Sequence, residues 1–445
     1  MNENKLGVMP VNKLLITMSV PMMISMLVQA LYNVVDSIFV SMVSEDAFTA
    51  VSLVFPWQNL MIAVSVGVGV GMNALISKSL GQKNQEKADK LAMQGLLINV
   101  ISAVIFMICG LVFAQPFMKS QSQDASIVLY GTQYFNICLA FSLGLFVEIS
   151  AEKMLQATGR TVLSMIVQGT GAILNIILDP ILIFGLFGAP RLEVAGAAYA
   201  TVIGQIVAGV LGMILNVKCN PELTLKLKNL IPSMKLIAEI LVIGVPSILM
   251  ASIGSIMTLC MNSILMAFSK THVSVFGAYF KLQSFVFMPL FGLNNGMIPI
   301  VAYNYGAQNK KRMLDAIKYS AIYAFVIMLV GVLLCQIVPD KLLLLFNASE
   351  NMISIGVPAL RIISSCFIFA GFCIVASSVF QAVGKSMYSL FLSFARQLVV
   401  LIPVAYLMSL SGNATLVWLS YPIAEVVSVT LSFIFLRKII KNLDF

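Results

Sequence analysis

The chain has 445 residues, of which 60% are hydrophobic and only 10% are charged. Soluble globular proteins are about a quarter charged, so this composition excludes both an ordinary soluble enzyme and a disordered chain. The net charge is +9, but the basic residues lie in short segments between apolar runs. That distribution is typical of membrane topology and not of a nucleic-acid surface. We therefore expect an all-α polytopic membrane protein that sits in a lipid bilayer and binds no nucleic acid.

Twelve apolar runs are each long enough to cross a bilayer, which takes roughly 20 helical residues. In chain order we predict spans near 14–43, 50–77, 91–117, 127–151, 161–187, 195–217, 236–268, 275–305, 314–338, 357–381, 387–410 and 414–436. Of the Lys and Arg residues in the connecting segments, nineteen fall on one side and four on the other. The excess of positive charge on the cytoplasmic side of membrane proteins then predicts that both termini are cytoplasmic.

Residues that bend helices or form turns recur at a distance of 225 residues. The matched pairs are Pro21 with Pro246, Gly67 with Gly292, Gly71 with Gly296, Gly81 with Gly306, and Asn84 with Asn309. Two six-span halves of the same orientation are a common plan of transport proteins. We predict an N-terminal lobe over 1–217, a cytoplasmic basic linker over 218–235 and a C-terminal lobe over 236–445.

Several polar residues lie within the predicted spans of the first half. Asp36 is in the first span, Asp179 is in the fifth with Asn175 one turn before it, and Thr201 is in the sixth. At about 1.5 Å per residue, all of them come out at a similar depth below the outer boundary. Ionisable groups in hydrocarbon are costly and indicate a functional site. Their oxygens can bind sodium or share protons, or each polar group only hydrogen-bonds a neighbouring helix.

Two prolines and one glutamate add to this pattern. Pro21 interrupts the first span and Pro180 follows Asp179, and each removes a backbone hydrogen bond, so both are candidate hinges. Glu152 lies near the cytoplasmic end of the fourth span. It either faces a substrate cavity or forms a solvated helix end with Lys153.

The second half carries different polar residues at membrane depth. The positions that match Asp36 and Asp179 hold Met261 and Val404. Lys281, Arg396 and Glu425 occur instead. Arg396 and Glu425 are candidates for a structural ion pair, and Lys281 is expected to extend outward near His272. The acid chemistry is therefore assigned to the first half.

Enzyme and cofactor motifs are missing from the sequence. It contains no phosphate-binding Gly-x-x-x-x-Gly-Lys-Ser/Thr loop, no nucleophile elbow and no zinc motif. The single histidine excludes a histidine-rich metal site, and the seven cysteines include no close Cys-x-x-Cys pair. The 27 methionines and 28 phenylalanines suit either an adaptable pocket or ordinary packing against lipid. We expect neither an enzyme nor a cofactor, and no metal beyond sodium.

As a set, these residues resemble the MATE (multidrug and toxic compound extrusion) antiporters over essentially the whole chain. The motifs that carry the resemblance are Pro21 to Asp36, Gly81 with its basic loop, Gln156-Ala157-Thr158-Gly159-Arg160, Asn175-x-x-x-Asp179-Pro180, and Tyr303-Asn304-Tyr305-Gly306-Ala307. The resemblance is closest to the bacterial MepA-like and DinF-like branch. It implies two six-helix lobes around a central cavity, and export of cationic amphipathic compounds, antibiotics included, from the bacterial inner membrane in exchange for protons or sodium.

Carried over residue by residue, the resemblance implies an ion-coupling site, which is also where sodium would bind, at Asp36, Asn175, Asp179 and Thr201. It further suggests substrate contacts at Glu152, Gln156 and Asp179, in a chain that works as a monomer. The acid of the NorM-like branch in the seventh span is missing from 252–262. A flippase for lipid-linked saccharides of the same superfamily is the alternative, against which the acids of the first half argue. An ion channel or receptor explains neither the duplication nor the paired hinges.

Overall fold

The computed structural model describes residues 4–346 and 348–443, and over these residues the chain forms helices and no strand. The first half contains α1 (Lys5–Val8), α2 (Val11–Val43), α3 (Glu45–Gly81), α4 (Gln85–Gln121), α5 (Ala125–Ala140), α6 (Leu143–Ala157), α7 (Thr161–Phe184), the 3-10 turn η1 (Leu186–Gly188), α8 (Val194–Cys219) and the 3-10 turn η2 (Leu227–Leu230).

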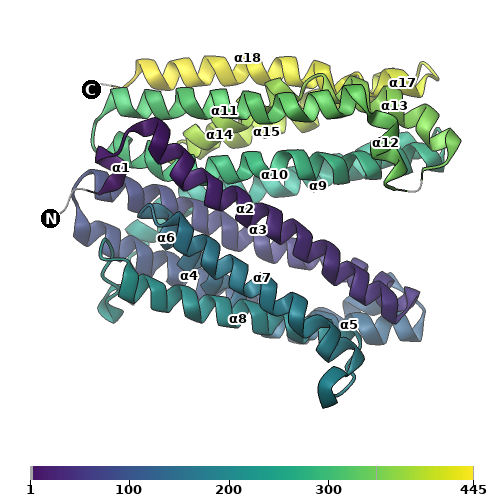
Figure 1. The fold of residues 1–445 in the computed structure, drawn as a ribbon, viewed down its shortest axis with the longest axis horizontal. Helices are drawn as coiled ribbons and strands as arrows, with labels where there is room; N and C mark the ends of the chain where they lie inside the picture. The colour runs from purple at the N-terminus through teal and green to yellow at the C-terminus, as the bar shows by residue number, and fades with distance from the viewer. Residues whose placement is uncertain (1–3, 347, 444–445) are drawn as a thin grey trace. The chain divides into compact units, whose positions relative to one another are not determined.

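The second half begins with α9 (Met234–Met266), α10 (Lys270–Gly306), α11 (Lys310–Ile337), α12 (Pro339–Leu344), α13 (Glu350–Ser364) and α14 (Phe367–Ala382). It continues with α15 (Ser386–Phe394), the π-helix η3 (Ala395–Leu401), α16 (Ile402–Ser409), α17 (Ala414–Val417) and α18 (Ser420–Lys441). Figure 1 shows these helices in order of colour from purple to yellow.

Most of the predicted spans coincide with these helices. Nine stretches of the described chain are long and apolar enough to cross a membrane, and two bent helix pairs bring the number to eleven. The remaining prediction, 414–436, falls on α17 and α18. Many large apolar side chains on these helices are exposed, as expected of a surface that faces lipid and not water.

The fourth and tenth spans are broken, which the sequence did not predict. The axes of α5 and α6 differ by 46°, and those of α13 and α14 by 48°. No proline or glycine occupies either break. Instead, Ser142 Oγ donates to the carbonyl of Ala103, and Ser365 Oγ donates to the carbonyl of Ile362. Such side-chain hydrogen bonds compete with the regular helix pattern, so polar residues at these two positions end one helix and begin the next.

The structure confirms the internal repeat. Helices α3 and α10 are both 37 residues long and begin after the capping residues Ser44 and Ser269, which are 225 residues apart. Asn84 and Asn309 cap the next helices at the same distance. Lys83 and Gln308 both adopt a positive φ, of 57° and 55°. Equal helix lengths, caps and turns in the two halves show that the duplication extends to the local backbone.

The described chain packs into two units that interleave in sequence. Unit 1 comprises Met1–Val8 and Ile24–Val245, and unit 2 comprises Met9–Met23 and Pro246–Phe445. Helix α2 therefore divides between the units two residues after Pro21, and α9 divides immediately before Pro246. Within unit 1, α7 and α8 run side by side and make the largest helix–helix contact (Figure 1). Rings of Trp57, Phe117 and Phe135 pack edge to face in its interior.

Glycines allow α3 and α10 to approach other helices closely. In unit 1, a Cβ on Gly71 would overlap the carbonyl oxygen of Ile240 on α9. In unit 2, a Cβ on Gly296 would lie 2.8 Å from the backbone nitrogen of Ser19 on α2. The two glycines are matched by the repeat, so each half holds the first segment of the other half's leading helix by the same kind of contact.

Substitution of Gly71 by alanine is expected to destabilise the protein by about 1–3 kcal/mol, because the new methyl group overlaps backbone that cannot rotate away. Gly169 on α7 is the matched control, since a Cβ there meets nothing within 4 Å. Gly169→Ala should change the stability by no more than about 1 kcal/mol and in the stabilising direction. Thermal unfolding in detergent measures both, and equal effects would contradict the close contact.

The segment that joins the two halves is fastened to α4. Gln94 Nε2 donates to the carbonyls of Asn229 and Ile231 at 2.7 and 2.8 Å, and Gln94 Oε1 accepts from the backbone N–H of Ser233 at 3.0 Å. Asp89 Oδ1 accepts from the backbone N–H of Thr224 at 2.8 Å. One face of α4 thus satisfies backbone groups along most of the linker, which fixes its path.

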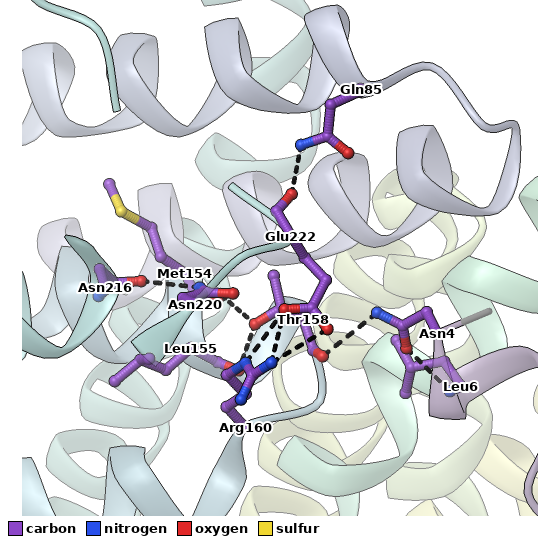
Figure 2. A network of polar contacts seen from close by, with 10 residues as sticks. All are labelled: Asn4, Leu6, Gln85, Met154, Leu155, Thr158, Arg160, Asn216, Asn220 and Glu222. Atoms are coloured by element: carbon purple, nitrogen blue, oxygen red, sulfur yellow. Dashed lines mark hydrogen bonds and ion pairs between the residues drawn. The ribbon is translucent and has the colours of Figure 1, made fainter. Parts of the chain in front are cut away.

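Arg160 fixes the beginning of the same linker. Its Nε and Nη2 donate to Glu222 Oε2 at 3.1 and 2.9 Å, and Figure 2 shows the guanidinium group turned toward this carboxylate. Gln85 Nε2 donates to the backbone carbonyl of Glu222 from the other side (Figure 2). Burial and the neighbouring Arg160 lower the pKa of the Lys5 ammonium group in the adjoining α1. A bidentate arginine–carboxylate pair holds its partners in one orientation.

Gln94→Leu should release the linker, because it removes the partner of three backbone groups at a cost of roughly 1–3 kcal/mol for each group left buried. The exposed Lys226 and Lys228 then become better trypsin sites, and cleavage of the purified protein under native conditions should be faster. Gln121→Leu, at the exposed end of the same helix, is the control and should be cleaved like the wild type. Equal rates for the two variants would argue against the clamp.

Candidate functional site

The candidate site begins with a close contact between α7 and α8. A Cβ on Gly204 would lie 2.8 Å from the carbonyl oxygen of Gly171, so the two helices approach at a point where neither has a side chain. One turn further along α7, Asn175 Nδ2 donates to Thr201 Oγ1 on α8 at 3.1 Å. Asn175 Oδ1 is buried and has no hydrogen-bond partner among the residues described. One acceptor of this amide is therefore available to a ligand.

Asp179 lies one turn after Asn175 on the same face of α7 and is completely buried. The carboxyl group of Asp36, on the part of α2 that belongs to unit 1, is close enough to form a hydrogen bond with that of Asp179 when one of the two is protonated. Both oxygens of Asp179 and Oδ1 of Asp36 are otherwise without a partner in the described part of the chain. The structure thus brings Asp36, Asn175, Asp179 and Thr201 together within unit 1.

Pro180 follows the second carboxylate directly and lies inside α7. Because proline has no N–H group, the carbonyl of Ile176 has no helical donor at this turn. The helix is therefore weakened at the turn that carries Asp179.

Polar residues that the sequence did not single out complete the site. Tyr32 lies one turn before Asp36, and its hydroxyl interacts with Thr201. Gln58 Nε2 donates to the hydroxyl of Tyr134 at 3.3 Å and to Cys138 Sγ at 3.6 Å. The available signal was weak, because Tyr32 differs from the surrounding apolar residues only by one hydroxyl group. Its spacing of four residues from Asp36 places it on the same helix face.

Two carboxyl groups at this distance in an apolar setting constrain what the site can hold. Two negative charges repel each other strongly where water does not screen them, so both groups remain ionised only when a cation lies between or beside them. Otherwise they share a proton. The carboxylate, amide and hydroxyl oxygens are also the ligands that hard cations prefer. Among the described residues, no group of three or more His, Cys, Asp or Glu side chains could hold a metal.

The predicted substrate contacts on α6 are placed differently. Glu152 is 7% exposed and follows Glu148, which is 9% exposed, by one helical turn. The amide of Gln156 is engaged on both sides, since Lys153 Nζ donates to Oε1 at 2.9 Å and Nε2 donates to Ser164 Oγ at 3.0 Å. Gln156 therefore joins α6 to α7, and the cluster as a whole is buried and not solvated.

In unit 2, the residues that match the two aspartates carry no charge. Met261 is fully buried, and the charged residues lie elsewhere. Arg396 Nη1 lies 3.4 Å from Glu425 Oε2, so the predicted ion pair is present. Lys281 is exposed, and its ammonium group lies 5.9 Å from the centre of the Phe346 ring.

The two halves also match known proteins. The MatE family model matches residues 21–181 and again residues 246–407. "Multidrug export protein MepA" of Staphylococcus haemolyticus is 27% identical over 422 residues, which cover 94% of this chain and 92% of that protein.

Solved structures agree in fold. A structure of MATE in the straight conformation is 28% identical, with a TM-score of 0.93 over 100% of this chain and 99% of the other. A structure of MATE in the bent conformation is 27% identical, with a TM-score of 0.92 over 100% of this chain and 98% of the other. This likeness confirms the predicted all-α fold of twelve membrane-spanning helices in two lobes.

The family also settles the broad class of the protein. The family is one of transporters, and the relatives are named as export proteins, so the expectation that the chain is not an enzyme is confirmed. Both halves of the chain are covered by the family model, in the same order and at the spacing of the internal repeat. The chain belongs to the MatE family.

Proposed function

We propose that the chain is a secondary active antiporter that exports cationic amphipathic compounds across the cell membrane in exchange for protons or sodium. The observation that carries this proposal is the pairing of Asp36 with Asp179 beside the free acceptor of Asn175, within the apolar interior of unit 1. The export activity named for the staphylococcal MepA supports it. The asymmetry of Lys and Arg favours a protein with both termini in the cytoplasm.

Competition for one negative charge explains how such an exchange works. An organic cation is stabilised near Asp36 and Asp179 while these groups are ionised. When a proton or a sodium ion binds to the pair, the counter-charge of the organic cation is lost and its affinity falls. Because a ligand shifts a conformational equilibrium only through its different affinity for the two states, the ion and the organic cation drive the protein in opposite directions.

Pro21 is proposed as the hinge that links ion binding to movement. It lies on α2, fifteen residues before Asp36, and α2 divides between the two units directly after it. Pro246 occupies the matching place at the division of α9. Solved MATE structures in straight and bent conformations show that relatives of this chain adopt more than one shape. Pro180 is a second proposed hinge, because it weakens α7 at Asp179.

Glu152 is retained as a proposed substrate contact, since it is an acid at membrane depth outside the aspartate pair. The amide of Gln156 is bound to Lys153 and Ser164, so it would act by positioning Lys153 and not by direct contact. A flippase for anionic lipid-linked saccharides fits less well, because the unpaired carboxyl groups of unit 1 repel anions. The chain is proposed to act as a monomer.

The coupling ion is identified in proteoliposomes by imposing one gradient at a time. Ethidium transport that follows a pH gradient in sodium-free buffer assigns the proton. Transport that follows a sodium gradient at equal pH on both sides assigns sodium. Transport with neither gradient would contradict antiport.

Asp36→Asn is expected to abolish ion-driven ethidium export, because the amide neither binds a proton reversibly nor supplies a negative charge. Ethidium efflux from energised cells measures the effect, and the amount of protein in the membrane fraction shows whether the variant is made. Glu45→Gln is the matched control, since it removes one charge at the exposed first turn of α3 and should export normally. Normal export by Asp36→Asn would refute the scheme.

Thr201→Val is expected to lower the stability by about 1–3 kcal/mol, because it leaves the buried amide of Asn175 without its acceptor. It should also slow export, since the freed amide can turn toward the aspartates. Thr201→Ser keeps the hydroxyl group and should restore both properties. Thermal unfolding and ethidium efflux measure the two effects, and identical behaviour of the two variants would show that the hydroxyl group plays no part.

A further inference from the structure

Unit 2 contains a buried charged pair that the proposed exchange does not use. Arg396 lies in the π-helix η3 and contacts Glu425 on α18 through a single hydrogen bond of 3.4 Å, from Nη1 to Oε2. Glu425 is 5% exposed, and its other oxygen, Oε1, is buried without any partner in the described part of the chain. Removal of a carboxylate oxygen from water without a replacement hydrogen bond is costly, so this atom is a vacant acceptor.

The position of the pair in the repeat points to a ligand site. The stretch 386–409, which contains η3, matches α7 at a distance of 225 residues, and α18 follows it as α8 follows α7. The polar centre of unit 1 lies on α7 and α8, at Asn175 and Thr201. In unit 2 the same two helix positions carry Arg396 and Glu425. π-helical turns such as η3 are frequent at functional sites, because the wider turn redirects the side chains that it carries.

Aromatic rings adjoin the vacant acceptor. Tyr421 lies one turn before Glu425 on α18, and its ring centre is 5.9 Å from that of Tyr279 and 6.4 Å from that of Phe276, both on α10. Its hydroxyl lies 3.9 Å from the sulfur of Met257 on α9. Arg396 is close enough to Tyr279 and Tyr421 to interact with both electrostatically. The ion pair and the rings therefore form one cluster inside unit 2.

We propose that this cluster is a second ligand site, which binds an aromatic amine. An N–H group of the ligand donates to Glu425 Oε1, and the ring of the ligand packs against Tyr279 and Tyr421. Aromatic pairs of this kind are favourable beyond the area that they bury. The proposal deepens the proposed function, because it names a substrate class and a place for it outside the aspartate site.

The two sites select ligands by different properties. In unit 1 the aspartates have no basic partner, so positive charge decides what binds. In unit 2 Arg396 already balances the charge of Glu425, so a cation gains little there from charge alone. Hydrogen-bond donation and ring shape decide instead. A ligand that has both an aromatic amine and a positive charge fits both sites, whereas a cation without an N–H group fits only the first.

Two probes separate these properties. Ethidium carries two aromatic amino groups, and tetraphenylphosphonium carries four rings and a positive charge but no N–H group. The chain has two tryptophans, and the ring of Trp418 lies 6.2 Å from that of Phe276. In a Trp57→Phe background, Trp418 is the only tryptophan and reports binding in unit 2 by fluorescence quenching. The measurement uses the purified full chain without any ion gradient, so it does not depend on transport.

Glu425→Gln in this background should weaken ethidium binding by about tenfold, because the side-chain amide presents a donor where the ligand needs an acceptor. Tetraphenylphosphonium binding should change by less than about twofold and shows that the rings remain in place. Glu350→Gln removes the same charge at the exposed first turn of α13 and should change neither affinity. Arg396→Gln/Glu425→Gln leaves no unpaired charge and decides the question if the single variant does not fold.

Unchanged ethidium affinity in Glu425→Gln, or an equal loss for both probes, would overturn the proposal. In the double variant, ethidium affinity equal to that of the Trp57→Phe parent would do the same. Neither result bears on antiport, which is tested by Asp36→Asn. Conversely, normal export by Asp36→Asn would refute the exchange scheme while a Glu425-dependent binding of ethidium still stood.

Discussion

The approach of two carboxyl groups inside an apolar helix bundle is the constraint on which the rest of the structure depends. Asp36 and Asp179 come from helices that are more than a hundred residues apart in sequence, and no basic side chain is in printed contact with either of them. Two such groups remain together only if they bind a proton or a cation. The glycine contact of α7 with α8 and the amide of Asn175 surround this point, so small residues and polar residues serve one purpose.

A duplicated scaffold carries two chemistries. The repeat reproduces helix lengths, caps and turns, down to the positive φ of Lys83 and Gln308. It does not reproduce the charges, because Met261 and Val404 replace the aspartates and the ion pair of Arg396 with Glu425 appears in their place. Backbone geometry is thus common to both units, whereas the binding chemistry of each unit is set by a few side chains. This separation lets one half change its ligand without loss of the fold.

The sequence predicted the features that depend on residue type and spacing. Apolar runs located the spans, proline and glycine revealed the repeat, and costly polar residues in those runs identified Asp36, Asn175, Asp179 and Thr201. Features that depend on tertiary contact were missed. The breaks at Ser142 and Ser365 come from hydrogen bonds that the sequence does not show, and Tyr32 enters the site only because α2 passes α8 there. The roles of Asp36, Asn175, Asp179 and Thr201 remain predictions until the variants are measured.

The fastening of the linker to α4 restricts how the molecule changes shape. Backbone groups from Glu222 to Ser233 are held by Gln85, Asp89 and Gln94 on one rigid helix, so this connection cannot lengthen or swing. Any rearrangement of one half against the other must then be absorbed inside continuous helices. Since α2 and α9 are the helices that both units share, elastic bending of two rods replaces the loose loop by which many two-domain proteins open and close.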